Sequence, residues 1–336
     1  MNTNSKSRLY PIWLLALILP VGGRYRRVLT AAVIMALLWL VLNALDGKTD
    51  NYEKLFFAAV IAYSIAIFSR IIMQSQRALD EIARELDAPG DVMAEQRLSI
   101  SHKSALWIIV TTVGAVTFGL LHLTLIYGSR GAPFNEVFFS GHFVARHIGT
   151  IATWLVMTTN ISALFANALL WASVGRSIEI DLFRPGPACI IGRTAVLSTL
   201  SVIGAQVLFV ILIMGQGWDW VSVFPGLAAS FAPAMLLFFI PVWPLHKRLQ
   251  GARQSMLIAV DDDIRKLGPI SEARIRDGTA IDQFNRLLVM RREVQQVSTW
   301  PFDGTNLLRI AFYLLLIPLT WVGAALVENV VDLFLV

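Results

Sequence analysis

The chain has 336 residues, of which 56% are hydrophobic and only 15% are charged. Soluble domains carry about 25% charged residues, so this composition argues against a soluble protein and indicates a chain that lies in lipid. The net charge of +5 does not indicate nucleic-acid binding, because the basic residues gather on one side of the predicted membrane. The single cysteine, Cys189, excludes a disulfide framework within the chain and a CxxC metal site.

Residues 1–27 precede the first predicted membrane span. The apolar stretch from Leu9 to Pro20 is too short to cross a hydrocarbon core, which takes about 20 residues. A signal peptide needs a small-residue cleavage site, and the basic run from Gly22 to Arg27 is a poor one. We therefore predict an interfacial or a re-entrant segment with basic flanks.

The region 28–243 is predicted to hold six spans, because apolar runs of about 20 residues recur along it. Their ranges are 28–45, 55–73, 104–127, 147–174, 191–214 and 221–243. The charged segment 74–103 connects the second and third spans and has helical periodicity up to Pro89. Prolines in the sixth span predict a kinked helix, which we expect to end between Pro241 and Pro244.

Residues 244–304 form a charged arm. Apolar residues recur at helical spacing on both sides of the turns at Gly268 and Gly278, which predicts two helices packed as an antiparallel hairpin. The predicted interface consists of Leu249, Met256, Ile264, Phe284 and Leu288. Two alternatives stay open: the hairpin buries this interface within one chain, or it meets another subunit and anchors an oligomer.

The arm ends in a break from Val297 to Gly304, and residues 305–336 hold the last span (305–327) and a short tail. With the N-terminus in the cytoplasm, only four of the 28 lysines and arginines lie outside: Lys48, Lys54, Arg130 and Arg146. This distribution obeys the positive-inside rule. The sequence thus predicts an all-α bundle of about seven spans in the bacterial inner membrane, with the N-terminus inside, the C-terminus outside and a cytoplasmic hairpin.

Thr153, Asn160 and Asn167 lie seven residues apart and therefore on one face of the fourth span. Amides in lipid need partners, so these residues either make hydrogen bonds between helices or line a watery path shared with Gln206. Asn306 and Thr320 in the last span are further pore candidates. No Asp, Glu, Lys or Arg lies at the centre of a predicted span, which argues against proton pumps and ion-coupled carriers.

His122 and His147 lie near the outer ends of the third and fourth spans. Neutral imidazoles can bind haem or a metal, but their sequence spacing matches no known ligand pattern, so we favour interfacial hydrogen bonds. Catalytic motifs are lacking: Ser140-Gly-His142 has no nucleophile elbow around it. We predict no catalytic residue and no cofactor, and we favour a protein that is not an enzyme.

Two short motifs at the ends of the arm resemble those of uncharacterised bacterial multi-spanning membrane proteins: Pro244-Leu-His-Lys-Arg-Leu249 and Thr299-Trp-Pro-Phe-Asp303. The topology is similar to that of the seven-helix ion channels of the insect odorant and gustatory receptor type. That resemblance implies a cytoplasmic anchor and a seventh helix split near Trp300, with 305–327 as the pore helix. The Thr-Tyr and Gln-Phe motif of those channels is not matched, since Thr320-Trp321 is followed later by Val327-Glu328.

Three functions follow from this reading. The first is an oligomeric channel-like protein with the arm as its anchor and the last span near the axis. The second is a membrane scaffold or signalling protein that presents residues 244–304 to a cytoplasmic protein. The third is a secondary transporter with a binding site at the kinked sixth span. The predicted partners are the lipid bilayer, further copies of the chain, or that cytoplasmic protein, and not nucleic acid.

Overall fold

The computed structural model describes residues 9–19, 25–46, 49–86, 93–129, 144–212, 220–267 and 278–301, together with Leu308 and Phe312. Its elements are, in chain order, β1 (Leu9–Pro11), η1 (Trp13–Leu17), α1 (Arg26–Leu45), α2 (Asn51–Glu85), α3 (Ala94–Ser101), β2 (His102–Ser104), α4 (Ala105–Ser129), α6 (Val144–Ser177), α7 (Gly186–Val207), α9 (Trp220–Lys266) and α11 (Gly278–Gln296).

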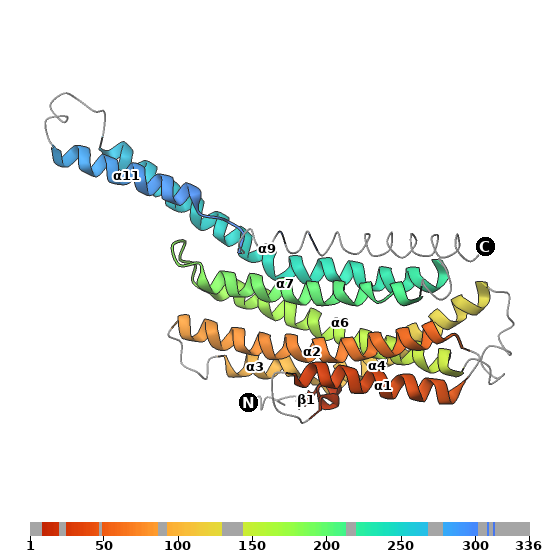
Figure 1. The fold of residues 1–336 in the computed structure, drawn as a ribbon. Helices are drawn as coiled ribbons and strands as arrows, with labels where there is room; N and C mark the ends of the chain where they lie inside the picture. Colours follow the sequence, from red (N-terminus) through yellow and green to blue (C-terminus); the bar gives the residue numbers. More distant parts are fainter. Residues whose placement is uncertain are drawn as a thin grey trace, which may run out of the picture.

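The chain folds as a bundle of long helices. Within the described residues, five helices are long and apolar enough to cross a membrane: Arg26–Leu45, Asn51–Glu85, Ala105–Gly128, Val144–Ser177 and Gly186–Leu212. Figure 1 shows these helices and the first part of α9 lying side by side along a common direction. The predicted helical bundle is therefore confirmed, whereas the seven spans and their orientation stay predictions.

Two helices, α1 and α4, have the surface expected beside lipid. Only 11% of the apolar stretch of α1 and 22% of that of α4 is buried within the chain. Large apolar side chains such as Leu40, Leu106 and Val113 are exposed on them. A helix that is apolar all round and not covered by protein is stable only in an apolar surrounding. These two helices therefore suit the edge of a membrane-embedded bundle.

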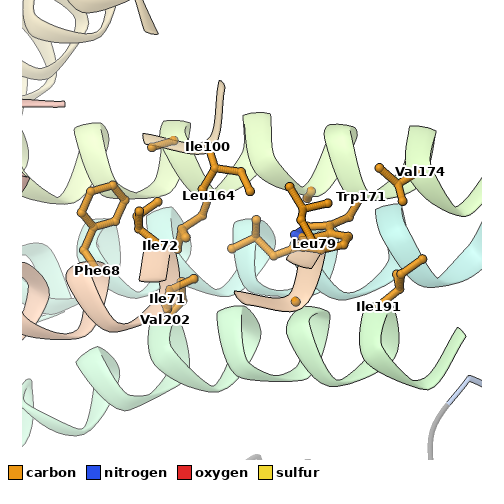
Figure 2. Packing of buried hydrophobic residues seen from close by; sticks show 14 of the residues in the cluster. Phe68, Ile71, Ile72, Leu79, Ile100, Leu164, Trp171, Val174, Ile191 and Val202 are labelled. Atoms are coloured by element: carbon orange, nitrogen blue, oxygen red, sulfur yellow. The ribbon is translucent and has the colours of Figure 1, made fainter. Parts of the chain in front are cut away.

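The second predicted span continues well beyond its expected end at Met73, because α2 runs on to Glu85. The reason is the apolar stripe formed by Phe68, Ile72, Leu79 and Ile82, whose spacings of three, four or seven residues keep them on one helix face. All four are buried, and Figure 2 shows three of them packed with Leu164 and other residues of the neighbouring helices. The first half of the charged segment 74–103 is thus a helical extension of the second span.

The N-terminal segment contains a strand that the all-α prediction missed. β1 pairs antiparallel with β2, with Tyr10 opposite Lys103. The backbone N–H of Ile12 also donates to the carbonyl of Ser101 at 3.0 Å, and the side chains of Ile12 and Leu14 are fully buried. Strands of three residues are too short to show an alternating pattern, so only tertiary pairing reveals them.

The expected helix end at Pro241 to Pro244 is wrong, because α9 is continuous from Trp220 to Lys266. Leu237, Val242 and Leu245 form a buried stripe that passes straight through the prolines. Packing of this stripe outweighs the backbone hydrogen bonds that proline removes. Figure 1 shows α9 leaving the bundle at an angle, and helices bend in this way at prolines.

The arm is a hairpin within one chain. Arg253 on α9 donates to the carbonyls of Val294, at 3.2 Å, and Gln295 on α11. A second link joins Arg291 and Asp261 at 2.7 Å between Nε and Oδ1. Within the predicted interface, Leu249 is buried and Leu288 is exposed. The other three residues, Met256, Ile264 and Phe284, are half-buried.

The arm is held to the bundle at its base. Arg248 on α9 donates through Nη1 to the carbonyls of Gly175, Arg176 and Ile178, at 3.0, 2.8 and 2.7 Å. An arginine in this position satisfies the last carbonyls of α6 and balances the negative end of its dipole. The chain is not helical from Val297 to Pro301, which confirms the predicted break over those residues. Asn306 and Thr320 lie outside the described residues.

Candidate functional site: the polar face of α6

A row of polar residues follows one face of α6 inside the bundle. Its members are Arg146, Thr150, Thr153, Asn160 and Asn167, separated by three, four or seven residues. Such spacings keep side chains on the same face of a helix. Arg146, Thr150 and both asparagines are buried, and Thr153 is half-buried. We call this row the polar face of α6.

The polar face begins with a buried ion pair. Arg146 Nε donates to Glu53 Oε2 on α2 at 2.8 Å, and the two side chains are only 8% and 7% exposed. A buried pair costs desolvation of both charges, which attraction and further hydrogen bonds must offset. A small cavity of about 60 Å³ lies beside it, lined among others by Glu53, Arg146, Thr150 and Thr153. The rest of its lining is mainly apolar and includes Phe56, Phe57 and Phe209.

The middle of the polar face holds amide groups that the protein satisfies only in part. Asn160 Nδ2 donates to the carbonyl of Ser64 at 3.4 Å, while its Oδ1 has no protein partner among the described residues. On α7, both side-chain amide atoms of the buried Gln206 also lack a hydrogen-bond partner among the described residues. An unsatisfied buried amide costs about 1–3 kcal/mol. These atoms therefore offer hydrogen bonds to water or to a solute.

At its Asn167 end, the polar face contacts a lysine of β2. Lys103 Nζ in β2 donates to Asn167 Oδ1 at 3.1 Å and to the carbonyl of Ser99 at 2.6 Å. Burial lowers the pKa of Lys103 to about 8, because its charged form is poorly solvated there. Asn167 Nδ2 has no protein partner in the described part of the chain. This end of the face thus presents a positive charge and a free amide donor.

The polar face is as long as the hydrocarbon core is thick. Arg146 and Asn167 are separated by 21 residues of one helix (167 − 146), which corresponds to about 31 Å at 1.5 Å per residue. The hydrocarbon core of a bilayer measures about 30 Å. The row therefore supplies polar groups at both ends and in the middle of a helix that is long enough to cross a membrane.

Of the predicted site residues, Asn160 and Asn167 lie together on the polar face, and Gln206 is buried on α7. The two candidate metal ligands have aromatic neighbours. His122 Nδ1 accepts a hydrogen bond from Trp154 Nε1 at 3.0 Å, and the ring of His147 stacks on that of Tyr127 at 5.4 Å. Across the described ranges, no group of three or more potential metal-ligating side chains is found.

Sequence reasoning missed Glu53, Arg146 and Lys103. The first two were assigned to outer loops and the third to a charged cytoplasmic segment, because charged residues are ordinarily solvated. One signal was present: Arg146 continues the seven-residue series of Thr153, Asn160 and Asn167 toward the N-terminus. No comparable pattern marks Glu53 or Lys103, which reach the site only through tertiary packing.

These features fit an integral membrane protein: five apolar helices of spanning length, two of them suited to lipid, around a polar face. Comparison with protein-family models, with curated proteins and with solved structures finds no match to this chain. The topological resemblance to odorant-receptor-type channels therefore stays a prediction.

Proposed function

We propose that the protein is an integral protein of the bacterial inner membrane that lets a small polar solute cross along the polar face of α6. One observation carries this proposal: buried polar groups recur over about 31 Å of α6, and amide atoms of Asn160, Asn167 and Gln206 have no protein partner among the described residues. A channel-like path then lies inside one chain, whereas the sequence alone favours the axis of an oligomer.

The residues of the path have distinct roles in this proposal. Asn160 offers an acceptor through Oδ1 and Asn167 offers a donor through Nδ2, and these groups replace part of the hydration shell of a solute. The charge of Arg146 is balanced by Glu53, whereas the ammonium group of Lys103 contacts a neutral amide and a carbonyl. The net positive charge at the Lys103 end favours anions or neutral solutes over cations.

Flux measurements test this function. The purified protein would be reconstituted into liposomes, and the entry of small anions, cations and neutral polyols would be compared. Asn160→Leu and Asn167→Leu each replace an amide by an apolar group of similar volume. Loss of one hydrogen bond worth about 1.4 kcal/mol in the barrier corresponds to a flux about tenfold lower.

A matched variant is Asn285→Leu on the exposed side of α11, which should leave flux unchanged. Equal flux in wild type and in both polar-face variants would exclude the path. Thermal unfolding of each variant in nanodiscs shows whether a loss of flux follows from a loss of folded protein.

The arm supports a second candidate role, contact with another protein. Ile258 and Val289 are 55% and 59% exposed on the hairpin, although both are apolar. Further copies of the chain are the partner we favour, and a cytoplasmic protein is the alternative. Native mass spectrometry from mild detergent distinguishes a closed ring from a monomer, and a monomer would leave the cytoplasmic protein as the candidate partner.

A further inference from the structure

A second cavity, away from the polar face of α6, is lined by arginines. It has a volume of about 710 Å³ and lies where η1, the start of α1, α2 and β2 meet. Arg26, Arg27 and Arg77 line it together with Ser101 and His102, and none of the described residues around it is acidic. We call it the arginine cavity.

Within the described ranges, no carboxylate balances the positive charges of the arginine cavity. Arg26 Nε donates to the carbonyl of Leu19 at 2.7 Å, and Arg27 Nη2 contacts Met73 Sδ at 3.2 Å, so both contacts are to neutral groups. Arg70 and Arg77 on α2 lie close enough for their charges to repel that of Arg27. Clustered like charges raise the free energy of the protein unless an anion binds among them.

The nearest acidic residues of α2 are engaged elsewhere. Asp80 pairs with Arg97 at 3.1 Å, and Glu81 pairs with Arg193 at 2.7 Å. Both follow Arg77 by about one helical turn. The described part of the chain therefore contains no ion pair for Arg26, Arg27, Arg70 or Arg77.

The cavity lies at the start of α1, which is the end of a helix long enough to cross a membrane. Arg26 is the first residue of α1, whose 20 residues span about 30 Å. Arginines at the end of a spanning helix lie where the hydrocarbon core meets the headgroup region. The same cavity also has an apolar wall, formed by Leu15, Ile18, Ile72 and Met73. It thus combines cationic groups at the membrane surface with apolar groups beside them.

We propose that the arginine cavity binds a phosphate-bearing anion, with the phosphate held by Arg26, Arg27 and Arg77. Guanidinium groups donate paired hydrogen bonds that match the geometry of phosphate oxygens. Basic pockets between membrane helices bind the headgroups of anionic lipids in this way. A phospholipid uses both the arginines and the apolar wall, whereas a soluble phosphomonoester uses only the arginines.

Two binding experiments on the full chain test the proposal and distinguish the two sources of phosphate. In the first, native mass spectrometry from mild detergent compares retention of added phosphatidylglycerol and phosphatidylcholine. In the second, inorganic phosphate and glycerol phosphate are titrated against lipid-depleted protein, with the thermal unfolding temperature as the readout. Preference for phosphatidylglycerol assigns a lipid, and stabilisation by the soluble phosphates assigns a soluble ligand.

The site variant combines Arg26→Gln, Arg27→Gln and Arg77→Gln. A basic residue near the membrane surface is worth about 1 kcal/mol toward an anionic lipid, so each arginine lost should lower the preference about fivefold. The control removes the same charge from the exposed arm by Arg265→Gln, Lys266→Gln and Arg286→Gln. If the triple variant does not fold, Arg77→Gln alone serves, because Arg77 is exposed and its replacement removes no buried contact.

Two results would overturn the proposal. One is wild-type protein that retains both lipids equally and is not stabilised by either phosphate compound. The other is an arm variant that loses the preference as strongly as the site variant, because the effect would then reflect net charge alone. Neither lipid retention nor the unfolding temperature depends on flux. These experiments therefore test phosphate binding in the arginine cavity independently of the proposed path along α6.

Discussion

Lys103 and Asn167 lie 3.1 Å apart, from the ammonium nitrogen of one to the amide oxygen of the other, and this contact joins β2 to α6. It connects a residue of the small sheet with the last polar residue of the α6 face. The charge on Lys103 therefore depends on how the N-terminal segment, β2 and α6 pack together.

We expect the stability of the protein to depend on pH through Lys103. Burial lowers its pKa from 10.5 to about 8, so between these values the unfolded chain carries a proton that the folded chain lacks. Stability rises with pH wherever the unfolded state binds more protons. The unfolding temperature of wild type in nanodiscs should therefore rise between pH 8 and 10 relative to that of Lys103→Met. Parallel curves for the two proteins would show that Lys103 keeps its ordinary pKa.

Replacing only one member of the ion pair between Glu53 and Arg146 should strongly destabilise the folded protein. Glu53→Gln leaves a buried arginine without its carboxylate, and such changes cost about 3–5 kcal/mol. The double variant Glu53→Gln, Arg146→Gln should recover part of the loss, because no unbalanced charge remains. Thermal unfolding of both single variants and the double variant gives the coupling between the two side chains.

The exposed ion pair between Glu81 and Arg193 is the matched control for these Glu53 and Arg146 variants. Glu81→Gln should change stability by about 0–1 kcal/mol, since surface ion pairs contribute little. Equal effects of Glu53→Gln and Glu81→Gln would mean that the buried pair is solvated after all.

Gly149 allows close contact between α6 and α2. A Cβ atom added there would fall on the ring of Phe57, so Gly149→Ala should destabilise the protein by about 1–3 kcal/mol. The matched change is Gly114→Ala on α4, where an added Cβ atom meets nothing within 4 Å. Alanine is a better helix former than glycine, so this change should be neutral or stabilising by up to about 1 kcal/mol. Equal unfolding temperatures for the two variants would contradict the packing of α6 on α2.

The hairpin of the arm should depend on Arg253, which donates to two carbonyls at the end of α11. A hydrogen bond from a charged group contributes about 1.5–3 kcal/mol, so Arg253→Ala should speed amide hydrogen exchange in α11 by about tenfold or more. Arg265→Ala, which removes an exposed pair within α9, should leave that exchange unchanged. Faster exchange in both variants would indicate that the hairpin is held by general charge rather than by this contact.

The sequence predicts the position of a helix well wherever that helix is one continuous apolar run. The runs that became α1 and α4 were identified within a few residues, because lipid-facing helices are apolar all round. The stripe of α2 was visible beyond Met73, but the charges around it were interpreted as the end of the span. In α9, Pro241 and Pro244 were given more weight than the buried stripe through them, which is a case of tertiary packing that overrides local propensity.

The candidate site was predictable where its residues share one helix or, as with Gln206, where an amide interrupts an apolar run. Asn160 and Asn167 were found from their spacing, and Arg146 belonged to the same series. Glu53 comes from α2 and Lys103 from β2, and no pattern within either segment points to α6. The arginine cavity was hidden for the same reason, because Arg27 and Arg77 are far apart in sequence and meet only when α1 packs on α2.

The pairing of β1 with β2 also fixes an order of events during synthesis. Pro11 and Ser104 bound the two strands and are separated by about 93 residues (104 − 11), so at 5–20 residues per second β1 is made roughly 5–20 s before β2. During that time at least two membrane helices, α1 and α2, are completed while the first strand still lacks its partner. The first strand thus stays unpaired until residues 102–104 have been made, when α1 and α2 are already complete.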